Sequence, residues 1–489
     1  VGFVMAGLGP LTDSGYFYYQ LGMAPAGQLT SVAIATDWVG TNGQFDISTS
    51  TFVYGYKTVM QDGVSRDLAP GISIVRPVDV VNSSWGFEDP TGSQQPTMIL
   101  DALTFANHQT VCIAAGNHDD TQGPALVGGP ASGFNDISVG ALTGDLTVPK
   151  YGGMAPFSDT GPNDFLNPVT GEVIHGVRAA VSISAPGTDL ILPAYVGATG
   201  TNQSGTLFDL TGIDPSEYSQ LYFIGVAGTS FASPLTAGGA ALIVDAGYTN
   251  FGGGVSIDGR VVKAVLLNSA DKIPGWNNNT VNKNGVLFTA QGLDFNSGAG
   301  ALDLSRAYDQ YLSGTTNTPA LTGGTVQRLG WAFGHVASPT NNDYIIDAPI
   351  FKGEKFTATL DWFIPVFFDS TATPDPITDN LSSDALHAEY FDQLDLQVWL
   401  VENGILTKLI AESTSPYNNV DHLYFDIPDD GMYAIRVSYL GTTYDLDGTS
   451  PHADDYGLAW SVDAVPEPAS ALLFLSSLPL LLKRRRRSL

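Results

Sequence analysis

Short apolar runs alternate with helical patterns over the first part of the chain. The strand-like runs lie at residues 29–35, 79–83, 110–115, 137–141 and 222–226. The helical patterns lie at residues 96–107, 230–245 and 260–267. Strands that alternate with helices predict an α/β fold with a doubly wound parallel sheet, whose functional site lies at the carboxyl ends of the strands. An insertion at residues 163–180 is expected to form a surface hairpin.

The pattern changes to a period of two from about residue 318. Residues 356–362, 394–400 and 432–438 alternate apolar with polar side chains, and turns such as Asp429-Asp430-Gly431 separate the runs. This spacing predicts an antiparallel β-sandwich over residues 318–464. The sandwich resembles the jelly-roll modules of secreted bacterial enzymes.

The composition is strongly acidic and almost free of cysteine. Asp and Glu number 49 against 20 Lys and Arg, for a net charge of −29. Repulsion from phosphates argues against nucleic-acid binding. The single cysteine, Cys112, excludes an internal disulfide and is expected to be a buried, unreactive thiol. Asp392, Asp395 and nearby acids leave Ca²⁺ binding open, with solvated acidic loops as the alternative; no cofactor is otherwise required.

The stretch Gly228-Thr229-Ser230-Phe231-Ala232-Ser233-Pro234 stands between a strand and a small-residue helix. The Ser230 hydroxyl therefore lies beside free N–H groups and the positive end of a helix dipole. Pro234 is expected in the first helical turn, which needs no N–H there. The alternative is a serine that merely caps a buried helix.

This heptapeptide resembles the nucleophile motif of the subtilisin-like serine proteases (subtilases, peptidase S8 family). The resemblance implies that Ser230 is the attacking residue of a Ser-His-Asp triad. An esterase that uses the same serine is a weaker interpretation, because no Gly-x-Ser-x-Gly motif surrounds Ser230. The resemblance extends over residues 1–312, the predicted peptidase domain.

Two further segments match subtilase motifs. The run that ends in Gly116-Asn117 implies an oxyanion-hole asparagine at Asn117, with Gly116 in the substrate-binding region. Ser84, Trp85 and Gly86 match the strand that pairs with the substrate backbone. The alternatives are a turn asparagine and an ordinary buried strand.

The histidine and aspartate of the triad have no match in this chain. Val1 aligns with the valine of the family's His-Gly-Thr-x-Val motif, so both residues are expected upstream, and the chain itself is predicted to be an inactive fragment. The seven histidines are His108, His118, His175, His335, His387, His422 and His452, and none is followed by Gly-Thr. His118 is the nearest to the site, but the template places it on the wrong side of Ser230.

The C-terminal tail at residues 465–489 carries a separate signal. Val465-Pro466-Glu467-Pro468 precedes an apolar run at 469–482 and five basic residues at 483–487. The pattern resembles the PEP-CTERM sorting signal of Gram-negative bacteria, which implies recognition by an exosortase-type enzyme. It predicts a short transmembrane helix and transient inner-membrane association. A simple short anchor is the alternative, because the run falls short of the roughly 20 residues of a full span.

The sequence thus predicts a serine-type endopeptidase that hydrolyses polypeptides through an acyl-enzyme on Ser230. The protein is expected to be secreted or displayed on the surface of a Gram-negative bacterium. The alternative is a surface-displayed binding protein that uses an inactive protease fold as its scaffold.

Overall fold

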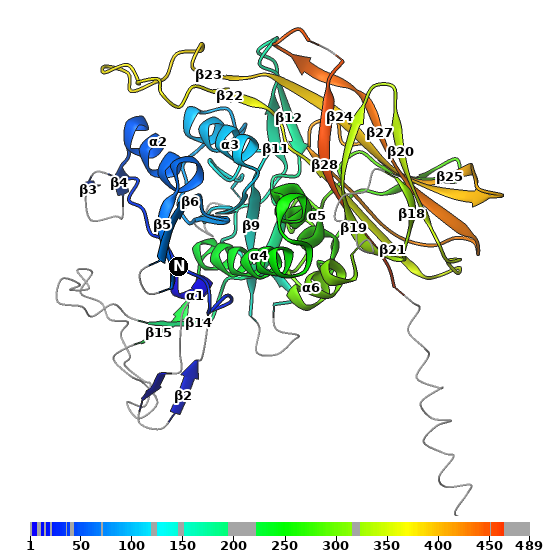
Figure 1. The fold of residues 1–489 in the computed structure, drawn as a ribbon, viewed down its shortest axis with the longest axis horizontal. Helices are drawn as coiled ribbons and strands as arrows, with labels where there is room; N and C mark the ends of the chain where they lie inside the picture. Colours follow the sequence, from blue (N-terminus) through cyan, green and yellow to red (C-terminus); the bar gives the residue numbers. More distant parts are fainter. Residues whose placement is uncertain are drawn as a thin grey trace, which may run out of the picture.

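The computed structural model describes residues 2–6, 11–13, 16–19, 22–35, 37–39, 44–69, 72–118, 125–144, 151–193, 222–314, 323–449 and 451–463. Its α-helices are α1 (Gly2–Ala6), α2 (Thr49–Lys57), α3 (Gln95–Asn107), α4 (Thr229–Phe251), α5 (Gly259–Asn268) and α6 (Leu304–Ser313). A π-helical turn at Thr58–Asp62 follows α2, and a 3-10 turn at Gly254–Ile257 precedes α5. The helices lie within residues 2–314, called the N-terminal half below. Long strands make up residues 323–463, called the C-terminal half (Figure 1).

A mostly parallel sheet forms the centre of the N-terminal half. Its order is β10-β9-β8-β7, and β13 pairs with β9. The strands are β7 (Val80–Ser83), β8 (Thr110–Ala114), β9 (Ile137–Thr143), β10 (Gly153–Met154) and β13 (Ile183–Pro186). All pairs among them are parallel except β9 with β10.

Helices cover both faces of this sheet. On β8, Val111 and Ile113 pack into a core that includes residues of α2 and α3, whereas Cys112 packs into the core of α4 and α5. Because successive side chains of a strand point to opposite faces, this division places the helices on the two sides. It explains why the run at 110–115 is apolar throughout. Cys112 is a free, buried thiol, as expected.

The strand predicted at residues 29–35 does not form, and this prediction is wrong. These residues are irregular, and a cavity of about 790 Å³ separates part of this segment from β7, the last strand of the sheet. Both the segment 28–32 and the strand β7 line the cavity. An apolar pattern alone does not make a strand, because the backbone groups need a neighbouring strand to pair with.

Two larger sheets form the C-terminal half and share one hydrophobic core. The seven-stranded sheet has the order β16-β17-β25-β24-β27-β20-β18, and the four-stranded sheet has the order β19-β28-β21-β26. Their strands are β16 (Val281–Lys283), β17 (Val286–Thr289), β18 (Gly324–Val326), β19 (Leu329–Ala337), β20 (Asn341–Ile346), β21 (Lys355–Trp362), β24 (Tyr390–Glu402), β25 (Ile405–Ser413), β26 (Val420–Asp426), β27 (Met432–Asp445) and β28 (Ala453–Asp463). Ile346 and Val437 of the first sheet join Leu360 and Leu458 of the second in that core.

These sheets are antiparallel except at two pairs of the seven-stranded sheet. The pairs β17–β25 and β18–β20 are parallel, which the alternating pattern did not predict. The smaller hairpins and pairs are β1 (Leu11–Asp13) with β2 (Tyr16–Tyr19), β3 (Asp37–Val39) with β4 (Gln44–Asp46), β5 (Val64–Ala69) with β6 (Ile72–Arg76), β11 (Asn163–Leu166) with β12 (Val173–Arg178), β14 (Leu190–Pro193) with β15 (Tyr222–Val226), and β22 (Val366–Phe368) with β23 (Leu386–Ala388). The pair β11–β12 is the hairpin expected at residues 163–180, although its Phe165 is buried in the C-terminal core.

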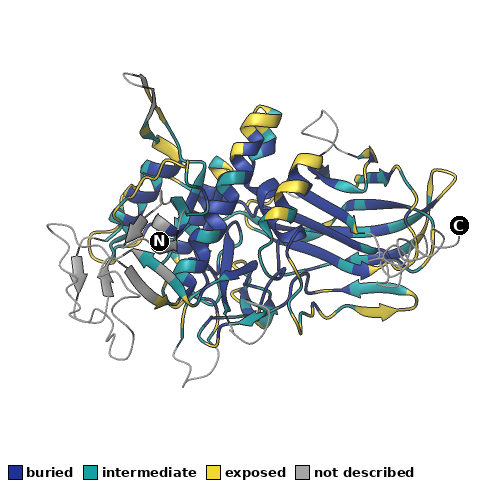
Figure 2. Cartoon of the chain, turned by 90° about the horizontal axis from the view of Figure 1, so that it is seen from below, coloured by how far each residue is buried: buried dark blue, intermediate teal, exposed yellow. Residues whose placement is uncertain are grey.

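The two halves are joined by packing and by hydrogen bonds. The hairpin β16–β17 extends the seven-stranded sheet through β25, although it precedes residue 312 in the sequence. Helix α5 packs on β21 and β28, and Lys263 of α5 forms a buried ion pair with Asp361 of β21 at 2.9 Å. Figure 2 shows buried residues that continue from the helices into the C-terminal strands. The domain boundary at residue 312 stays a prediction, and it separates segments that contact each other closely.

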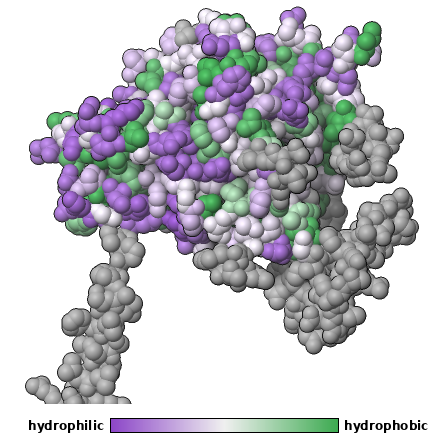
Figure 3. Space-filling model, turned by 180° about the vertical axis from the view of Figure 1, so that it is seen from behind, coloured by the Kyte–Doolittle hydropathy of each residue, from purple (hydrophilic) through white to green (hydrophobic). Residues whose placement is uncertain are grey.

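Hydrophilic side chains cover much of the face in Figure 3, with hydrophobic residues scattered between them. Within the described ranges, no helix is both long and apolar enough to cross a membrane. The predicted sorting signal at residues 465–489 lies outside the described residues.

Candidate active site

Ser230 is the second residue of α4 and is half-buried. The chain leaves β15 at Val226, turns at Gly228 and enters the helix at Thr229. Gly228 has a φ of 146°, a backbone conformation that favours glycine. Since no side chain of this turn caps the helix, its first N–H groups need acceptors from elsewhere.

Asn117, which follows β8, supplies one of these acceptors. Its Oδ1 accepts hydrogen bonds from the Thr229 N–H at 2.8 Å and from Thr229 Oγ1 at 3.0 Å. A backbone N–H can only donate, so these bonds fix which end of the amide faces Thr229. The Nδ2 group of Asn117 is therefore turned away from Thr229. This Nδ2 group is available as a hydrogen-bond donor at the exposed end of β8.

Ser84 and Ser230 exchange hydrogen bonds. Ser84 Oγ donates to the main-chain oxygen of Ser230 at 3.0 Å, and Ser230 Oγ donates to the main-chain oxygen of Ser84 at 3.4 Å. The first bond follows from Pro234, which lies four residues after Ser230 and has no N–H for the helical bond to that oxygen. Pro234 is thus the sixth residue of α4, and the prediction that it lies in the first turn is wrong.

Gly116 connects the asparagine to the rest of the site. Its N–H donates to Thr229 Oγ1 at 3.3 Å, and its carbonyl oxygen accepts from the Asp159 N–H at 3.0 Å. Its φ is +116°, and a Cβ at this position would overlap Asp159 Oδ2. Glycine is therefore required here for both conformation and space.

His118 contacts Asp159 and not the serine. Its Nδ1 lies 2.9 Å from Asp159 Oδ1, and both side chains are largely buried. Burial raises the pKa of the Asp159 carboxyl, and the hydrogen bond with His118 opposes that shift. The sequence prediction placed His118 away from Ser230, and no hydrogen bond joins the two within the described ranges. The same ranges hold no hydrogen bond from any histidine or aspartate side chain to Ser230.

The segment predicted to bind the substrate backbone lies directly after β7. The Trp85 side chain is partly buried, with Nε1 donating to Tyr56 Oη at 3.1 Å and its ring stacked on Phe87. Gly86 is exposed, and among the described residues the main-chain groups of Trp85 and Gly86 form no backbone hydrogen bond. The indole therefore has a packing role, while the backbone is free to pair with an extended peptide.

The acids considered for Ca²⁺ do not converge on one point. Asp392 bonds His452 and Thr442, whereas Asp395 bonds Thr414 and Gln397.

The sequence interpretation missed Thr229, which orients Asn117. The only signal for it was its place beside the serine in the motif.

A serine hydroxyl at a helix start, next to an amide donor at the end of a parallel strand, is an arrangement that serine hydrolases use for acyl transfer. The sequence profile of the subtilase family matches residues 26–300, which is more than half of the chain. The chain belongs to the subtilase family.

Individual relatives are distant. A probable subtilase-type serine protease of Deinococcus radiodurans is 27% identical over 229 residues, which cover 45% of this chain and 25% of that protein. The chain thus spans about a quarter of the length of this curated relative. Proteases from Pseudoalteromonas arctica match 63% of this chain and 69% of their own with 18% identity and a TM-score of 0.38. The prenylagaramide maturation protease PagA matches 56% of this chain and 71% of its own with 20% identity and a TM-score of 0.35.

Proposed function

We propose that the protein is a serine-type endopeptidase in which Ser230 attacks the scissile carbonyl of a polypeptide. The attack forms a tetrahedral intermediate, and the hydroxyl proton would pass to the histidine that the subtilase triad implies. The intermediate then collapses to an acyl-enzyme, and the same proton goes to the amine half of the substrate as the scissile C–N bond breaks. Water then hydrolyses the acyl-enzyme. This reaction class accords with the family and with the hydroxyl at the start of α4.

The observation that carries the proposal is the orientation of the Asn117 amide. Thr229 holds Oδ1, so Nδ2 is available to donate to the oxyanion. The N–H of Ser230 is the second proposed donor, at the positive end of the α4 dipole. The free backbone at Trp85 and Gly86 would align the peptide by strand-like pairing, and Ser84 and Gly116 are the other residues proposed to contact the substrate.

The second candidate is a binding protein with an inactive protease scaffold. It is favoured by the lack of a hydrogen bond between Ser230 and any histidine in the described part of the chain. A serine without a base keeps only the small rate enhancement that oxyanion stabilisation and binding provide. The two candidates therefore differ in whether Ser230 is activated in the protein made by the cell.

A fluorophosphonate probe separates them. The protein expressed from its complete gene is incubated with the probe, beside Ser230→Ala and a Ser383→Ala control on an exposed loop. Labelling of the wild type and the control, with none in Ser230→Ala, supports the endopeptidase. Equal labelling of all three, or of none, contradicts it and leaves the binding protein.

For the tail we propose, from its sequence, sorting by an exosortase-type enzyme at the inner membrane of a Gram-negative bacterium, followed by secretion or surface display. Deletion of residues 465–489 should then leave the protein in a different cell fraction from the intact chain. An unchanged distribution between fractions would argue against sorting through the tail. A structural Ca²⁺ remains a proposal without a defined site.

A further inference from the structure

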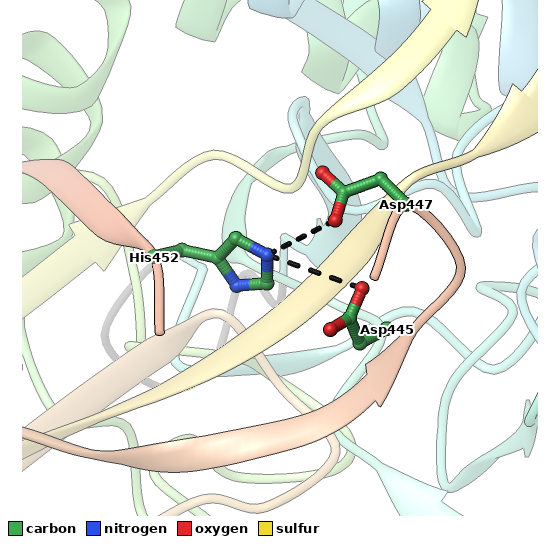
Figure 4. A group of neighbouring side chains, drawn as sticks. All are labelled: Asp445, Asp447 and His452. Carbon is green, nitrogen blue, oxygen red and sulfur yellow. Dashed lines mark hydrogen bonds and ion pairs between the residues drawn. The ribbon is translucent and has the colours of Figure 1, made fainter. Parts of the chain in front are cut away.

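Two aspartates and a histidine meet where the chain passes between the two C-terminal sheets. Asp445 ends β27, Asp447 follows it, and His452 directly precedes β28. One side-chain ligand atom of each lies within 4.8 Å of the others. Figure 4 shows both carboxylates directed at the same nitrogen of the His452 ring. These residues lie in the C-terminal half, away from α4, and the proposed peptidase reaction does not use them.

The histidine is held in one orientation. It is 9% exposed, its ring stacks on Tyr390 at 3.6 Å between centroids, and its Nδ1 lies 3.1 Å from both carboxylate oxygens of Asp392. A carboxylate that accepts the Nδ1 proton leaves the lone pair of a neutral imidazole on Nε2. This is the arrangement by which carboxylates orient metal-binding histidines.

Nε2 faces the two other carboxylates. It lies 3.3 Å from Asp447 Oδ1 and 4.0 Å from Asp445 Oδ1. In a tetrahedral zinc site, bond lengths of about 2.0–2.2 Å place neighbouring ligand atoms about 3.3–3.6 Å apart. The separation between Nε2 and Asp447 is thus close to that of two ligands around one ion. Asp445, whose Oδ1 also accepts from the Gly448 N–H at 2.6 Å, would have to move closer to Nε2 to complete the site.

The surroundings carry an excess of buried negative charge. Asp392 is 1% exposed and Asp454, its close electrostatic neighbour, is 5% exposed. Asp454 Oδ2 has no hydrogen-bond partner in the structure. Among the described residues, no lysine or arginine forms an ion pair with Asp392, Asp447 or Asp454. Buried carboxylates are normally paired or bound to a metal. The histidine itself is the one group in these contacts that could carry a positive charge, and a bound cation would offset the carboxylate charge while His452 stays neutral.

We infer that His452, Asp445 and Asp447 bind a divalent transition-metal cation of the Zn²⁺ type, with Asp392 as the residue that positions His452. An imidazole nitrogen among the ligands favours Zn²⁺ over Ca²⁺, which prefers oxygen ligands only. A water molecule would complete the tetrahedron. The ion would tie the end of β27, in the seven-stranded sheet, to the start of β28, in the four-stranded sheet, and so have a structural role.

Isothermal titration of the full chain, expressed without a polyhistidine tag, tests this inference. ZnCl₂ is expected to bind at one equivalent per chain and to raise the melting temperature by a few degrees, because the ion binds the folded state. Asp447→Asn and His452→Gln should each weaken binding at least tenfold. Co²⁺ in place of Zn²⁺ should give the visible absorption bands of a tetrahedral site.

Two control variants match these changes elsewhere on the surface. His175→Gln removes an exposed histidine that also contacts an aspartate, Asp164, and Asp429→Asn removes an exposed carboxylate of the same half of the chain. Both should bind Zn²⁺ as the wild type does. If His452→Gln fails to fold, the part-exposed Asp447→Asn decides the question. Absence of Zn²⁺ binding, undiminished binding in Asp447→Asn, or binding of Ca²⁺ but not Zn²⁺ would each overturn the inference.

Discussion

The hydroxyl of Ser84 donates to the main-chain oxygen of Ser230, and the hydroxyl of Ser230 returns a bond to the main-chain oxygen of Ser84. The end of β7 and the start of α4 are thus fixed to each other at the proposed nucleophile. Pro234 creates the need for the first bond, because it leaves the Ser230 oxygen without a helical donor. The position of Ser230 therefore depends on a residue at the end of β7, far from it in the sequence.

Ser84→Ala should weaken both stability and reactivity. The substitution leaves the Ser230 oxygen unpaired, so we expect the free energy of unfolding to fall by about 1 kcal/mol. Fluorophosphonate labelling of Ser230 should slow several-fold in the protein from the complete gene. Denaturant unfolding and labelling rates are the measurements, with Ser383→Ala as the control. Wild-type labelling rates in Ser84→Ala would show that this bond does not position the nucleophile.

Asn117→Asp should separate catalysis from folding. The variant keeps an oxygen that accepts from Thr229 but loses the Nδ2 donor. Loss of one oxyanion donor, of which a subtilisin asparagine is the known example, costs about 10²–10³-fold in kcat. Peptide hydrolysis should fall by that factor while the unfolding midpoint changes little.

Two variants of Thr229 test whether its hydroxyl orients the Asn117 amide. Thr229→Ser keeps the hydroxyl and should retain most activity. Thr229→Val removes it and should reduce the rate about tenfold, because one of the two bonds that orient Asn117 is lost. Equal activity in the two variants would contradict this role of the hydroxyl.

Breaking the ion pair between the two halves should destabilise the whole protein. Lys263 and Asp361 have side chains that are 3% and 0% exposed. Lys263→Met leaves a buried carboxylate unpaired, which costs about 3–5 kcal/mol, whereas the double variant with Asp361→Leu should recover most of that loss. The exposed pair Lys57–Asp62 is the control, since Lys57→Met should cost less than about 1 kcal/mol. Urea unfolding of the four proteins measures these differences.

Stability should fall as the pH rises from about 4 to about 7. Burial, helped by the charge of Glu412, raises the pKa of Asp395 from 3.8 to about 7, while hydrogen bonds from Thr414 and Gln397 oppose the shift. Between these two pKa values the folded state binds more protons than the unfolded state, so the free energy of unfolding decreases with pH. Burial also raises the pKa of Asp101 and of Asp361 to about 6, which adds to the same trend.

Asp395→Asn isolates the contribution of this carboxyl. The amide has no proton to lose, so unfolding free energies measured at pH 5 and pH 8 should differ less in the variant than in the wild type. A variant with the same pH dependence as the wild type would mean that Asp395 has the same pKa in the folded and the unfolded state.

The sequence was informative where a local motif determines the geometry. The heptapeptide around Ser230 and the run that ends in Asn117 predicted a serine at a strand-to-helix turn and an asparagine after a parallel strand, and the structure brings the two together through Thr229. The helix at 96–107 was predicted within one residue. These features depend on neighbours along the chain.

Features that depend on distant partners were not predictable in the same way. Residues 29–35 have a strand pattern but no adjacent strand, and the parallel pairing of β17 with β25 joins residues more than 100 positions apart. The hydrogen bond from Ser84 to the main-chain oxygen of Ser230, which Pro234 leaves without a helical donor, likewise joins residues that are far apart in the sequence. Asp392 was considered as a Ca²⁺ ligand, but the sequence did not connect it with His452, because these residues are 60 positions apart and meet only in the folded chain.

The parallel pairing of β17 with β25 also limits how the chain can be divided. A recombinant piece that starts at residue 318 would present β25 as a bare edge, with unpaired backbone groups that invite other chains to add. A graft of the C-terminal sheets onto another protein would need to carry residues 281–289 along with it. The transferable unit of this protein is therefore discontinuous in sequence.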